Sequence, residues 1–425
     1  MTRIMILVAM LFAWLQAAQA GGFMVGEMAT RSTGMGSAFT AVADDPSAAW
    51  HNPAGVAYSN GMQVMAGGAA IIVPTGDFTS NTANPLHPRT TSSGSQAFFV
   101  PHTYFTYMDQ DSRLGASLSI NAPFGLETDW PTTGPFANKN TFSRIQMANI
   151  NPSVVFMLAD NFAIAAGVSY TYVNNVDLNN TIQLLNGDGD GWGGNASIFY
   201  KGDGVNFGVT YRSRIKIDVD GTATAVSTGA LSTAFGGTSS TAKTQFTLPD
   251  MVNVGLAWMP NEDWTLSVDV DWVNWKTYDS VDITYDSAAY RTAVLSLQTA
   301  VGATATGKTT LPQNWSSTVA FRAGAEWKYN SQMSARIGYV FDPTPIEDVD
   351  FSPSVPGNDR HIMSIGYSYN FNAKTTIDLA YAFVYFVNRD QIASPVTAVG
   401  APNTVKNGRY ESTAHIVAGS LTHRF

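Results

Sequence analysis

The chain has 425 residues, of which 45% are hydrophobic and 12% aromatic, with no cysteine and a formal net charge of −9. The lack of cysteine excludes a disulfide scaffold and thiol chemistry. The acidic balance argues against nucleic acid as a partner, because such binding requires neutralisation of phosphates. The six histidines lack the spacing of metal ligands. We therefore predict no cofactor, no metal and no enzymatic activity.

Residues 1–20 have the features of an export signal. Arg3 precedes the apolar run Ile4–Leu15, and Ala18–Ala20 fits a small-x-small cleavage pattern. The run is shorter than the ~20 residues of a spanning helix, which disfavours the alternative of a membrane anchor. No later segment has ~18 consecutive apolar residues. The mature chain, expected to begin at Gly21, is therefore either a large soluble β-protein or a β-barrel.

Alternating segments favour the barrel. In Trp264–Trp272, large apolar residues occupy every second position, and Thr, Ser and Asp lie between them. A strand with this period has one apolar and one polar face. The apolar face of a soluble sandwich would point to its core, whereas that of a membrane barrel meets lipid between girdles of aromatic residues. Two Trp about nine residues apart match a membrane strand, and Ile377–Tyr385 repeats the pattern.

Fourteen such segments follow one another, joined alternately by short polar turns and long loops. This asymmetry and the even number are typical of outer-membrane barrels. We predict an all-β fold, a transmembrane antiparallel β-barrel of about 14 strands spanning residues 61–425. The segments are 62–74, 96–108, 112–122, 144–158, 162–176, 192–201, 204–220, 245–259, 263–284, 313–328, 332–343, 359–371, 374–389 and 408–425.

The last segment ends in an aromatic residue. Phe425, Leu421 and Val417 share one face. Such a strand resembles the signal by which bacterial outer-membrane barrels are recognised for assembly, although an ordinary last strand of a sandwich could look the same. We expect outer-membrane lipid, lipopolysaccharide and the assembly machinery as partners, the last through Phe425, and we expect a monomer in the outer membrane of a Gram-negative cell.

Several short motifs in a fixed order carry a family resemblance. With the export signal and Phe425, they make the chain resemble the FadL family of outer-membrane transporters for long-chain fatty acids, which includes TodX-like importers of aromatic hydrocarbons. The motifs are Gly22-Phe23, Ala43–Asp45, Asn52–Ala54, Tyr211–Asp218, Leu248–Asp250, Arg336–Tyr339, Asp342–Pro345 and Pro356–Arg360. The resemblance implies import of a hydrophobic small molecule and a small N-terminal hatch of short helical turns inside the barrel.

The expected hatch spans residues 21–60 and is rich in Gly, Ala, Ser and Thr. Phe23 could reach from it into a ligand pocket. Asn52 should end a helical turn, because the residue before a proline avoids the α region. Asn52, Pro53 and Ala54 could simply reverse the chain, or they could form a loop that seals the channel and moves when ligand binds.

The third strand contains a break. Residues 113–120 alternate, and the pattern then stops at Asn121, Pro123, Phe124 and Gly125. Proline cannot donate to a strand ladder and glycine has no side chain to pack, so we predict an inward kink and lost pairing with a neighbour. In the FadL family this position opens the barrel wall sideways. The alternative is that Pro123 begins an outer loop.

Four arginines are candidates for holding a ligand carboxylate: Arg212, Arg214, Arg322 and Arg336. For any single one we favour a structural role, paired with Asp269, Asp271 or Asp378. Residues 170–176 on the fifth strand carry no basic residue, unlike fatty-acid-importing members of the family, and the loop at 177–191 is short. A neutral hydrophobe is therefore also a plausible ligand.

Other parts of the sequence concern an outer groove, a calcium-like segment and the alternatives to an importer. Apolar candidates for an outer groove are Leu126, Trp130, Phe136, Leu184, Leu185 and Phe235. The segment Asn186–Gly191 looks like a calcium loop but lacks the distal glutamate of that pattern and lies where we expect an outer turn. Two alternatives to the importer stay open: a general porin, and an adhesin or structural barrel acting through its outer loops.

Overall fold

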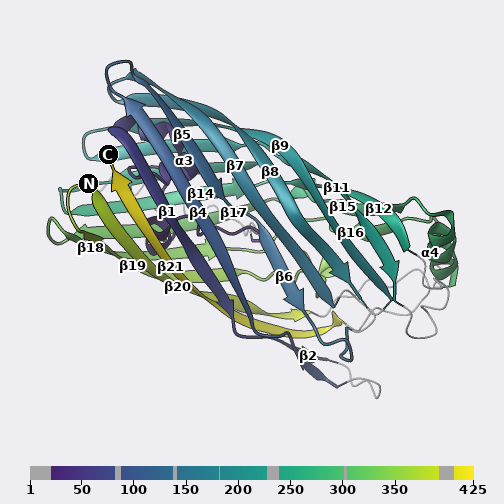
Figure 1. Cartoon of the computed structure of the whole chain (residues 1–425). Helices are drawn as coiled ribbons and strands as arrows, with labels where there is room; N and C mark the ends of the chain where they lie inside the picture. Colours follow the sequence, from purple (N-terminus) through teal and green to yellow (C-terminus); the bar gives the residue numbers. More distant parts are fainter. Residues whose placement is uncertain are drawn as a thin grey trace.

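A computed structural model describes residues 21–81, 88–136, 141–180, 182–226, 239–300, 304–391 and 406–425. The predicted residues 1–20 of the export signal lie outside these ranges. The described residues form a closed antiparallel barrel of 14 strands (Figure 1). Closure is achieved because β1 (Gly61–Val73) pairs with β4 (Gln96–Asp109) on one side and with the last strand, β21 (Gly408–Arg424), on the other.

Several wall strands are divided into two pieces. Between β4 and β21 the wall consists of β5 with β6 (Leu114–Asn121, Gly125–Asp129), β7 (Phe142–Ala159), β8 (Phe162–Asn179), β9 (Gln183–Lys201), β10 with β11 (Val205–Arg212, Ile215–Ala225), β12 with β13 (Ser239–Leu248, Met251–Trp258), β14 with β15 (Trp264–Val273, Ser280–Tyr285), β16 with β17 (Thr309–Pro312, Thr318–Lys328), β18 (Met333–Asp342), β19 (Arg360–Asn370) and β20 (Thr375–Gln391). A short hairpin, β2 (Gly76–Ser80) and β3 (Thr90–Ser92), extends the sheet beyond β1.

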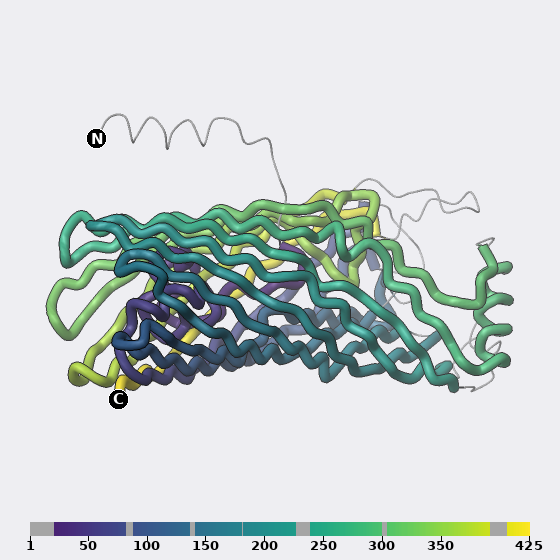
Figure 2. Tube along the Cα trace, turned by 90° about the horizontal axis from the view of Figure 1, so that it is seen from above, coloured from purple at the N-terminus to yellow at the C-terminus, as the bar shows by residue number. Residues whose placement is uncertain are grey.

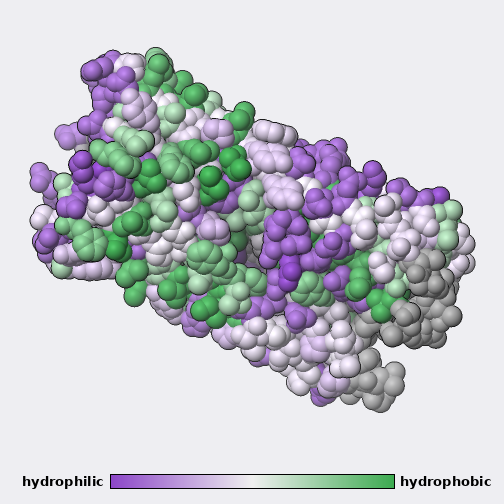
Figure 3. Space-filling model, in the orientation of Figure 1, coloured by the Kyte–Doolittle hydropathy of each residue, from purple (hydrophilic) through white to green (hydrophobic). Residues whose placement is uncertain are grey.

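The alternation in the sequence becomes an outer apolar face and an inner polar face. In β14, the side chains of Val268, Val270 and the two Trp residues, Trp264 and Trp272, are exposed on the outside. Those of Asp269 and Asp271 are buried inside. Strand β20 follows the same rule. Apolar residues gather over the part of the wall nearer the chain termini, and polar residues dominate toward helix α4 (Ala288–Ala300) (Figure 3). The prediction of a membrane barrel is confirmed.

The two ends of the barrel differ as predicted. Figure 2 shows the short turns at the end that holds the C-terminus, and the longer connections with α4 at the opposite end. At the C-terminus, the Phe425 N–H donates to Met62 O at 3.0 Å, while the ring is exposed. Among the described residues, no helix is both long and apolar enough to cross a membrane.

The connection between the fifth and sixth strands is shorter than expected. Strand β8 continues to Asn179 and β9 begins at Gln183, so most of the expected loop at 177–191 is strand. The candidate calcium segment Asn186–Gly191 lies within β9, paired with β11, and is no turn. No group of three or more His, Asp or Glu in the described parts of the chain could hold a metal. The sheet here extends past the lipid band, where polar outward residues no longer indicate a loop.

Four adjacent strands that we expected to be continuous are interrupted. The breaks fall between β10 and β11, β12 and β13, β14 and β15, and β16 and β17. Asp250 joins three of them, because it accepts hydrogen bonds from Arg214 N at 3.0 Å and Asn274 Nδ2 at 3.2 Å. Pro249 has no N–H for a ladder, which was a readable signal of a break. The short helix η3 (Trp275–Thr277) forms at one of these interruptions.

The N-terminal segment lies inside the barrel (Figure 2). Its helices are α2 (Thr30–Gly34), α3 (Ala48–His51) and η1 (Pro53–Tyr58). Helix α2 packs against β19 and β20, whereas η1 packs against β7, β8 and β9. Asn52 has an extended backbone and ends α3, in agreement with the effect of the following proline. A further 3-10 turn, η4 (Asp348–Asp350), lies in the loop between β18 and β19.

Candidate functional site

The barrel wall has a gap beside the third strand. Strand β5 pairs with β4 only as far as Thr103 and Ile120, and β6 pairs with β7. Residues 96–102 of β4 pair with β1 on their other edge, and no pairing with β6 joins them within the described chain. The interruption at residues 122–124 contains Pro123, as expected for a residue that cannot donate to a ladder. The two strands therefore separate at this point.

The kinked residues pair with the start of the chain. Met24 and Phe124 form an isolated antiparallel bridge. The Val25 N–H donates to Pro123 O at 2.9 Å, and the Gly125 N–H donates to Phe23 O at 3.0 Å. We call residues Gly21–Gly26 the arm and residues 27–60 the hatch body. The arm thus forms a short strand pair with the kink inside the barrel.

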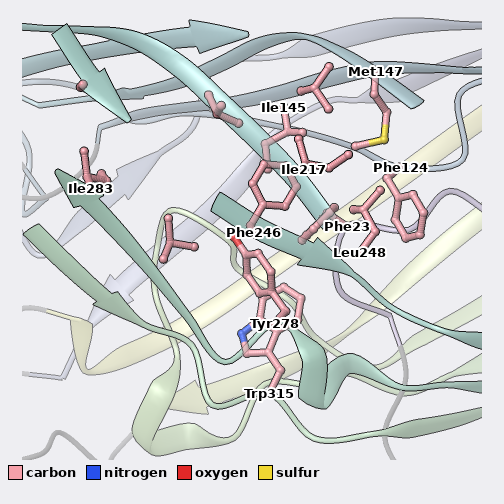
Figure 4. Packing of buried hydrophobic residues seen from close by; sticks show 14 of the residues in the cluster. Phe23, Phe124, Ile145, Met147, Ile217, Phe246, Leu248, Tyr278, Ile283 and Trp315 are labelled. Atoms are coloured by element: carbon pink, nitrogen blue, oxygen red, sulfur yellow. The ribbon is translucent and has the colours of Figure 1, made fainter. Parts of the chain in front are cut away.

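Phe23 lies in an aromatic cluster (Figure 4). Its ring centroid is 5.0 Å from that of Trp275, 5.3 Å from that of Tyr278, 5.8 Å from that of Trp315 and 5.9 Å from that of Phe124. A Cβ at Gly22 would come within 2.7 Å of the Trp275 ring, and Gly22 has φ +52°, so this position favours glycine. Trp275 and Trp315 point inward at two of the strand breaks, which is why sequence reasoning missed them.

A cavity of about 820 Å³ lies between the arm and the wall gap. Its floor is the arm, and its sides come from the gap-facing part of β4, from residues 120–128, and from residues 144–148 of β7. Figure 3 shows a hollow on the face formed by these strands. Apolar side chains dominate its lining, among them Phe98, Val100, Leu126, Ile145 and Met147. The volume and lining are typical of a pocket for a hydrophobic small molecule.

A loop between β18 and β19 covers the outer side of this cavity. Trp130 Nε1 donates to Pro353 O at 2.9 Å, and Thr128 Oγ1 donates to Ser354 O at 3.1 Å. Trp130 and Phe136 are buried with their ring centroids 4.9 Å apart, and Trp130 lines the cavity. Leu126 and Leu185 pack on the core, and Leu184 is exposed. Phe235 lies outside the described residues.

The four candidate arginines lie elsewhere. None of them is among the described residues that line the cavity. Arg322 Nε lies 2.5 Å from Asp271, Arg336 lies 2.5 Å from Glu326 and 3.2 Å from Asp378, and Arg214 lies 2.9 Å from Asp250. Arg212 differs, because it donates to Asn151 Oδ1 at 3.0 Å and to Trp50 O, and its guanidinium lies 3.7 Å from the centre of the Trp50 ring.

The cavity has its own cations, which are paired. Arg144 Nε lies 2.7 Å from Glu127 Oε2, and Arg144 Nη1 lies 3.9 Å from Asp177. Arg360 forms an ion pair with Asp342. An incoming carboxylate would have to compete with these acidic partners for either guanidinium.

The hatch body is attached to the wall by polar contacts. Asn52 Nδ2 donates to Thr40 O and to Ile198 O of β9, both at 3.0 Å, and Asn52 Oδ1 accepts from the Ala54 N–H. The Phe39 and Thr40 N–H groups donate to Asp269 at 2.9 and 2.8 Å. These contacts link the predicted tripeptide and its neighbours to three parts of the structure at once.

Arg31 provides the charged attachment of the hatch body. Its Nε lies 2.8 Å from Glu326 on β17, and its Nη1 pairs with Asp44 and Asp45. The neighbouring carboxylates raise the pKa of Arg31 above its usual value even though burial opposes this shift. The ion pair with Glu326 fixes α2 against the barrel wall.

Sequence comparison agrees with this architecture. The family described as "Outer membrane protein transport protein (OMPP1/FadL/TodX)" matches residues 11–425. The chain belongs to this family. It is therefore an outer-membrane transport protein and not an enzyme, as predicted.

Individual relatives are distant in sequence. The chain is 23% identical over 418 residues to the long-chain fatty acid transport protein of Escherichia coli K12, covering 87% of this chain and 88% of the relative. The crystal structure of a Pseudomonas aeruginosa FadL homologue has a TM-score of 0.78 at 18% identity, covering 95% and 99% of the two chains. That of the Ralstonia pickettii toluene transporter TbuX has a TM-score of 0.67 at 18% identity, covering 93% and 98%. These two structures share the fold.

Proposed function

We propose that this FadL/TodX family member imports hydrophobic small molecules by binding them in the 820 Å³ cavity and releasing them sideways between β4 and β6. The single observation that carries the proposal is the position of the cavity, which joins the wall gap to the buried arm. In this proposal residues 1–20 are the export signal, 21–60 the hatch and 61–425 the barrel.

Lateral release is favoured by the hydrophobic effect. A ligand that left through the polar lumen would meet water, whereas one that leaves through the wall enters hydrocarbon. The difference is about 0.8 kcal/mol per CH₂ group. Relatives that are named for long-chain fatty acid and for toluene transport agree with a hydrophobic ligand in general.

The arm is the element that we expect to move. Its pairing with the kink consists of two backbone hydrogen bonds and the contacts of Phe23, whereas the hatch body carries ion pairs and side-chain hydrogen bonds to the wall. Displacement of the arm would enlarge the cavity downward without removing the hatch body. We therefore propose a local rearrangement, with Phe23, Asn121, Pro123, Phe124 and Gly125 as the residues that rearrange.

Uptake tests this function. A transporter-deficient Gram-negative strain that expresses the chain should take up labelled oleate, labelled toluene, or both. Pro123→Ala combined with Gly125→Val should abolish this uptake, because both changes favour a continuous strand and a Cβ at Gly125 meets nothing closer than Ile145 O at 3.8 Å. Pro260→Ala, in a short turn at the opposite end, is the matched control.

Two results would contradict the proposal. Absent uptake by a correctly inserted protein would remove the importer function for these substrates. Equal uptake by the double variant and the wild type would remove the lateral route. A large, steady ion conductance in planar bilayers would instead favour the porin alternative.

A further inference from the structure

Two polar side chains face the cavity at the base of the wall gap. His102 on β4 and Asn121 at the end of β5 are each at most 3% exposed and line the cavity. Neither ring nitrogen of His102 has a hydrogen-bond partner in the described structure, nor does Asn121 Oδ1. These three atoms leave hydrogen-bonding capacity unused at the place where the wall opens, whereas most buried polar atoms in folded proteins have a partner.

The register of the wall explains why these residues meet. The last β4–β5 pair is Thr103 with Ile120. His102 and Asn121 occupy the next positions, where the two strands separate, and both side chains point inward. Both residues lie against Tyr104: the His102 ring stacks on the Tyr104 ring with centroids 5.7 Å apart, and Asn121 Nδ2 lies 3.5 Å from the Tyr104 hydroxyl. Gly67 on β1 leaves room for the imidazole, since a Cβ there would lie 2.7 Å from His102 Nε2.

The hydrogen-bonding capacity of the pair is defined. The Tyr104 hydroxyl donates to Met28 O, so its oxygen can accept from Asn121 Nδ2, which lies 3.5 Å away. Asn121 Oδ1 is then left as an acceptor without a partner, on a residue that lines the cavity. A neutral imidazole contributes one donor and one acceptor. The pair can therefore donate to a ligand oxygen and accept a proton from the same oxygen, as a hydroxyl group requires.

A carboxylate fits this place poorly. It carries no proton for Asn121 Oδ1, and the two cavity guanidinium groups, Arg144 and Arg360, already have carboxylate partners. A pure hydrocarbon fits the apolar lining but leaves all three polar atoms unpartnered. Other cavity-lining atoms without partners are Gln96 Nε2, Asn358 Oδ1 and Arg360 Nε.

We propose that His102 and Asn121 form a hydrogen-bonding subsite that selects hydrophobic ligands bearing an uncharged hydroxyl group, such as alkylphenols or long-chain alcohols. This inference rests on the proposed import function and specifies the ligand class of the same cavity. The hydroxyl group binds at the base of the gap, and the apolar part of the ligand lies along Phe98, Val100 and Met147.

Equilibrium dialysis of the full-length protein in detergent tests the subsite, with protein-free micelles as the blank. The probes are radiolabelled 4-ethylphenol, ethylbenzene and, at pH 8, 4-ethylbenzoate, which differ only in the group at one ring position. We expect 4-ethylphenol to bind about tenfold more tightly than ethylbenzene, and 4-ethylbenzoate to bind most weakly. His102→Phe and Asn121→Leu should each remove this preference and leave ethylbenzene affinity within about twofold.

The controls separate the subsite from other effects. His415→Phe removes an imidazole whose Nδ1 lies 2.8 Å from the Tyr381 hydroxyl on the outer face, and it should leave all three affinities unchanged. Retained ethylbenzene binding shows that a variant is folded. If His102→Phe binds nothing, the wild-type preference and Asn121→Leu still decide the question.

Several outcomes would overturn the inference. Equal wild-type affinity for 4-ethylphenol and ethylbenzene would assign the free polar atoms to water. Strongest binding of 4-ethylbenzoate would place an anion there, and an equal loss of both neutral probes in His102→Phe would give the imidazole a packing role only. Saturable binding without a hydroxyl preference overturns the subsite alone, whereas no saturable binding of any probe also overturns the binding of small aromatic ligands in this cavity.

Discussion

The arm and the hatch body are consecutive in the chain, yet they are held in the barrel by different forces. The arm, Gly21–Gly26, depends on two backbone hydrogen bonds to the kink, on one ring, Phe23, among four other aromatic rings, and at its last residue on a hydrogen bond from Ser37 Oγ to Gly26 O at 3.1 Å. The hatch body depends on directed polar contacts from Arg31, Asn52 and the backbone near Thr40. A hydrophobic ligand can replace aromatic contacts but cannot replace an ion pair, so the two parts should respond to a ligand differently.

Removal of the Phe23 ring should produce the largest effect. Phe23→Ala removes a buried ring, and substitutions of this kind destabilise the packed state by about 3–5 kcal/mol. The arm should detach from the kink while the hatch body stays in place. Hydrogen exchange of the Val25 and Gly125 amides should accelerate strongly, and exchange within α2 should not. Phe371→Ala, in an exposed turn, is the control, and coupled exchange of arm and hatch body would contradict the comparison.

Loss of the positive charge of Arg31 on α2 should have the second-largest effect. Arg31→Met removes one partner of the buried Glu326, whose remaining partner is Arg336 at 2.5 Å. Because that partner stays, we expect the protein to be destabilised by about 3 kcal/mol, at the lower end for a broken buried ion pair. Here α2 should lose exchange protection while the arm–kink pairing persists. The exposed pair Arg113–Asp160 offers the matched control Arg113→Met, which should cost under about 1 kcal/mol. Unchanged protection of the Thr33 amide would refute the attachment.

Asn52 tests the uncharged attachment. Asn52→Ala removes three hydrogen bonds and leaves Thr40 O and Ile198 O without that donor. We expect this loss to destabilise the hatch body by about 2 kcal/mol in total. Limited proteolysis between α3 and η1 should become faster. Asn206→Ala removes a single bond to Ala41 O at 3.3 Å and should have a smaller effect. An equal effect of the two substitutions would show that Asn52 makes no special contribution.

The smallest expected effect is a pH dependence of the hatch body. Burial, and then the nearby charges of Arg322 and Arg212, lower the pKa of His51 from 6.5 to about 3. His51 is therefore neutral in the packed state and takes up a proton only when released. The contribution of neutral His51 to the stability of the packed hatch body is constant above pH 6.5. This contribution falls as the pH decreases toward 3, and at pH 5.5 it is smaller by about 1.4 kcal/mol. Protection of α3 should decrease over this range, and His51→Gln should remove the dependence.

The alternating pattern predicted most of the wall. The faces of Trp264–Trp272 and Ile377–Tyr385, the short turns and the total of 14 strands were all visible in the sequence. The extension of β8 to Asn179 and the early start of β9 at Gln183 were not visible, because outside the lipid both faces of a strand can be polar. The strand breaks near Asp250 were also missed, although Pro249 gave a signal.

The sequence pointed to several residues of the candidate site and not to how they come together. The sequence indicated a break at Asn121–Gly125 and a special role for Phe23, but not that the two would pair. It indicated four candidate arginines, none of which lines the cavity in the described structure, and it gave no signal for Trp275, Trp315 or His102. Each of these contacts joins residues that are distant in the chain.

The sequence by itself determined which face of each strand meets lipid, because a strand has a period of two and its two sides contact different solvents. It also marked two places where a strand is interrupted, at Pro123 and Pro249, because proline carries no donor, although Pro101 and Pro152 lie within β4 and β7. Only the tertiary structure decided which inward side chains converge, since this depends on barrel closure and on the register between strands. The cavity, the pairing of its charges and the unpartnered atoms of His102 and Asn121 therefore follow from neighbours across the barrel and not from neighbours along the chain.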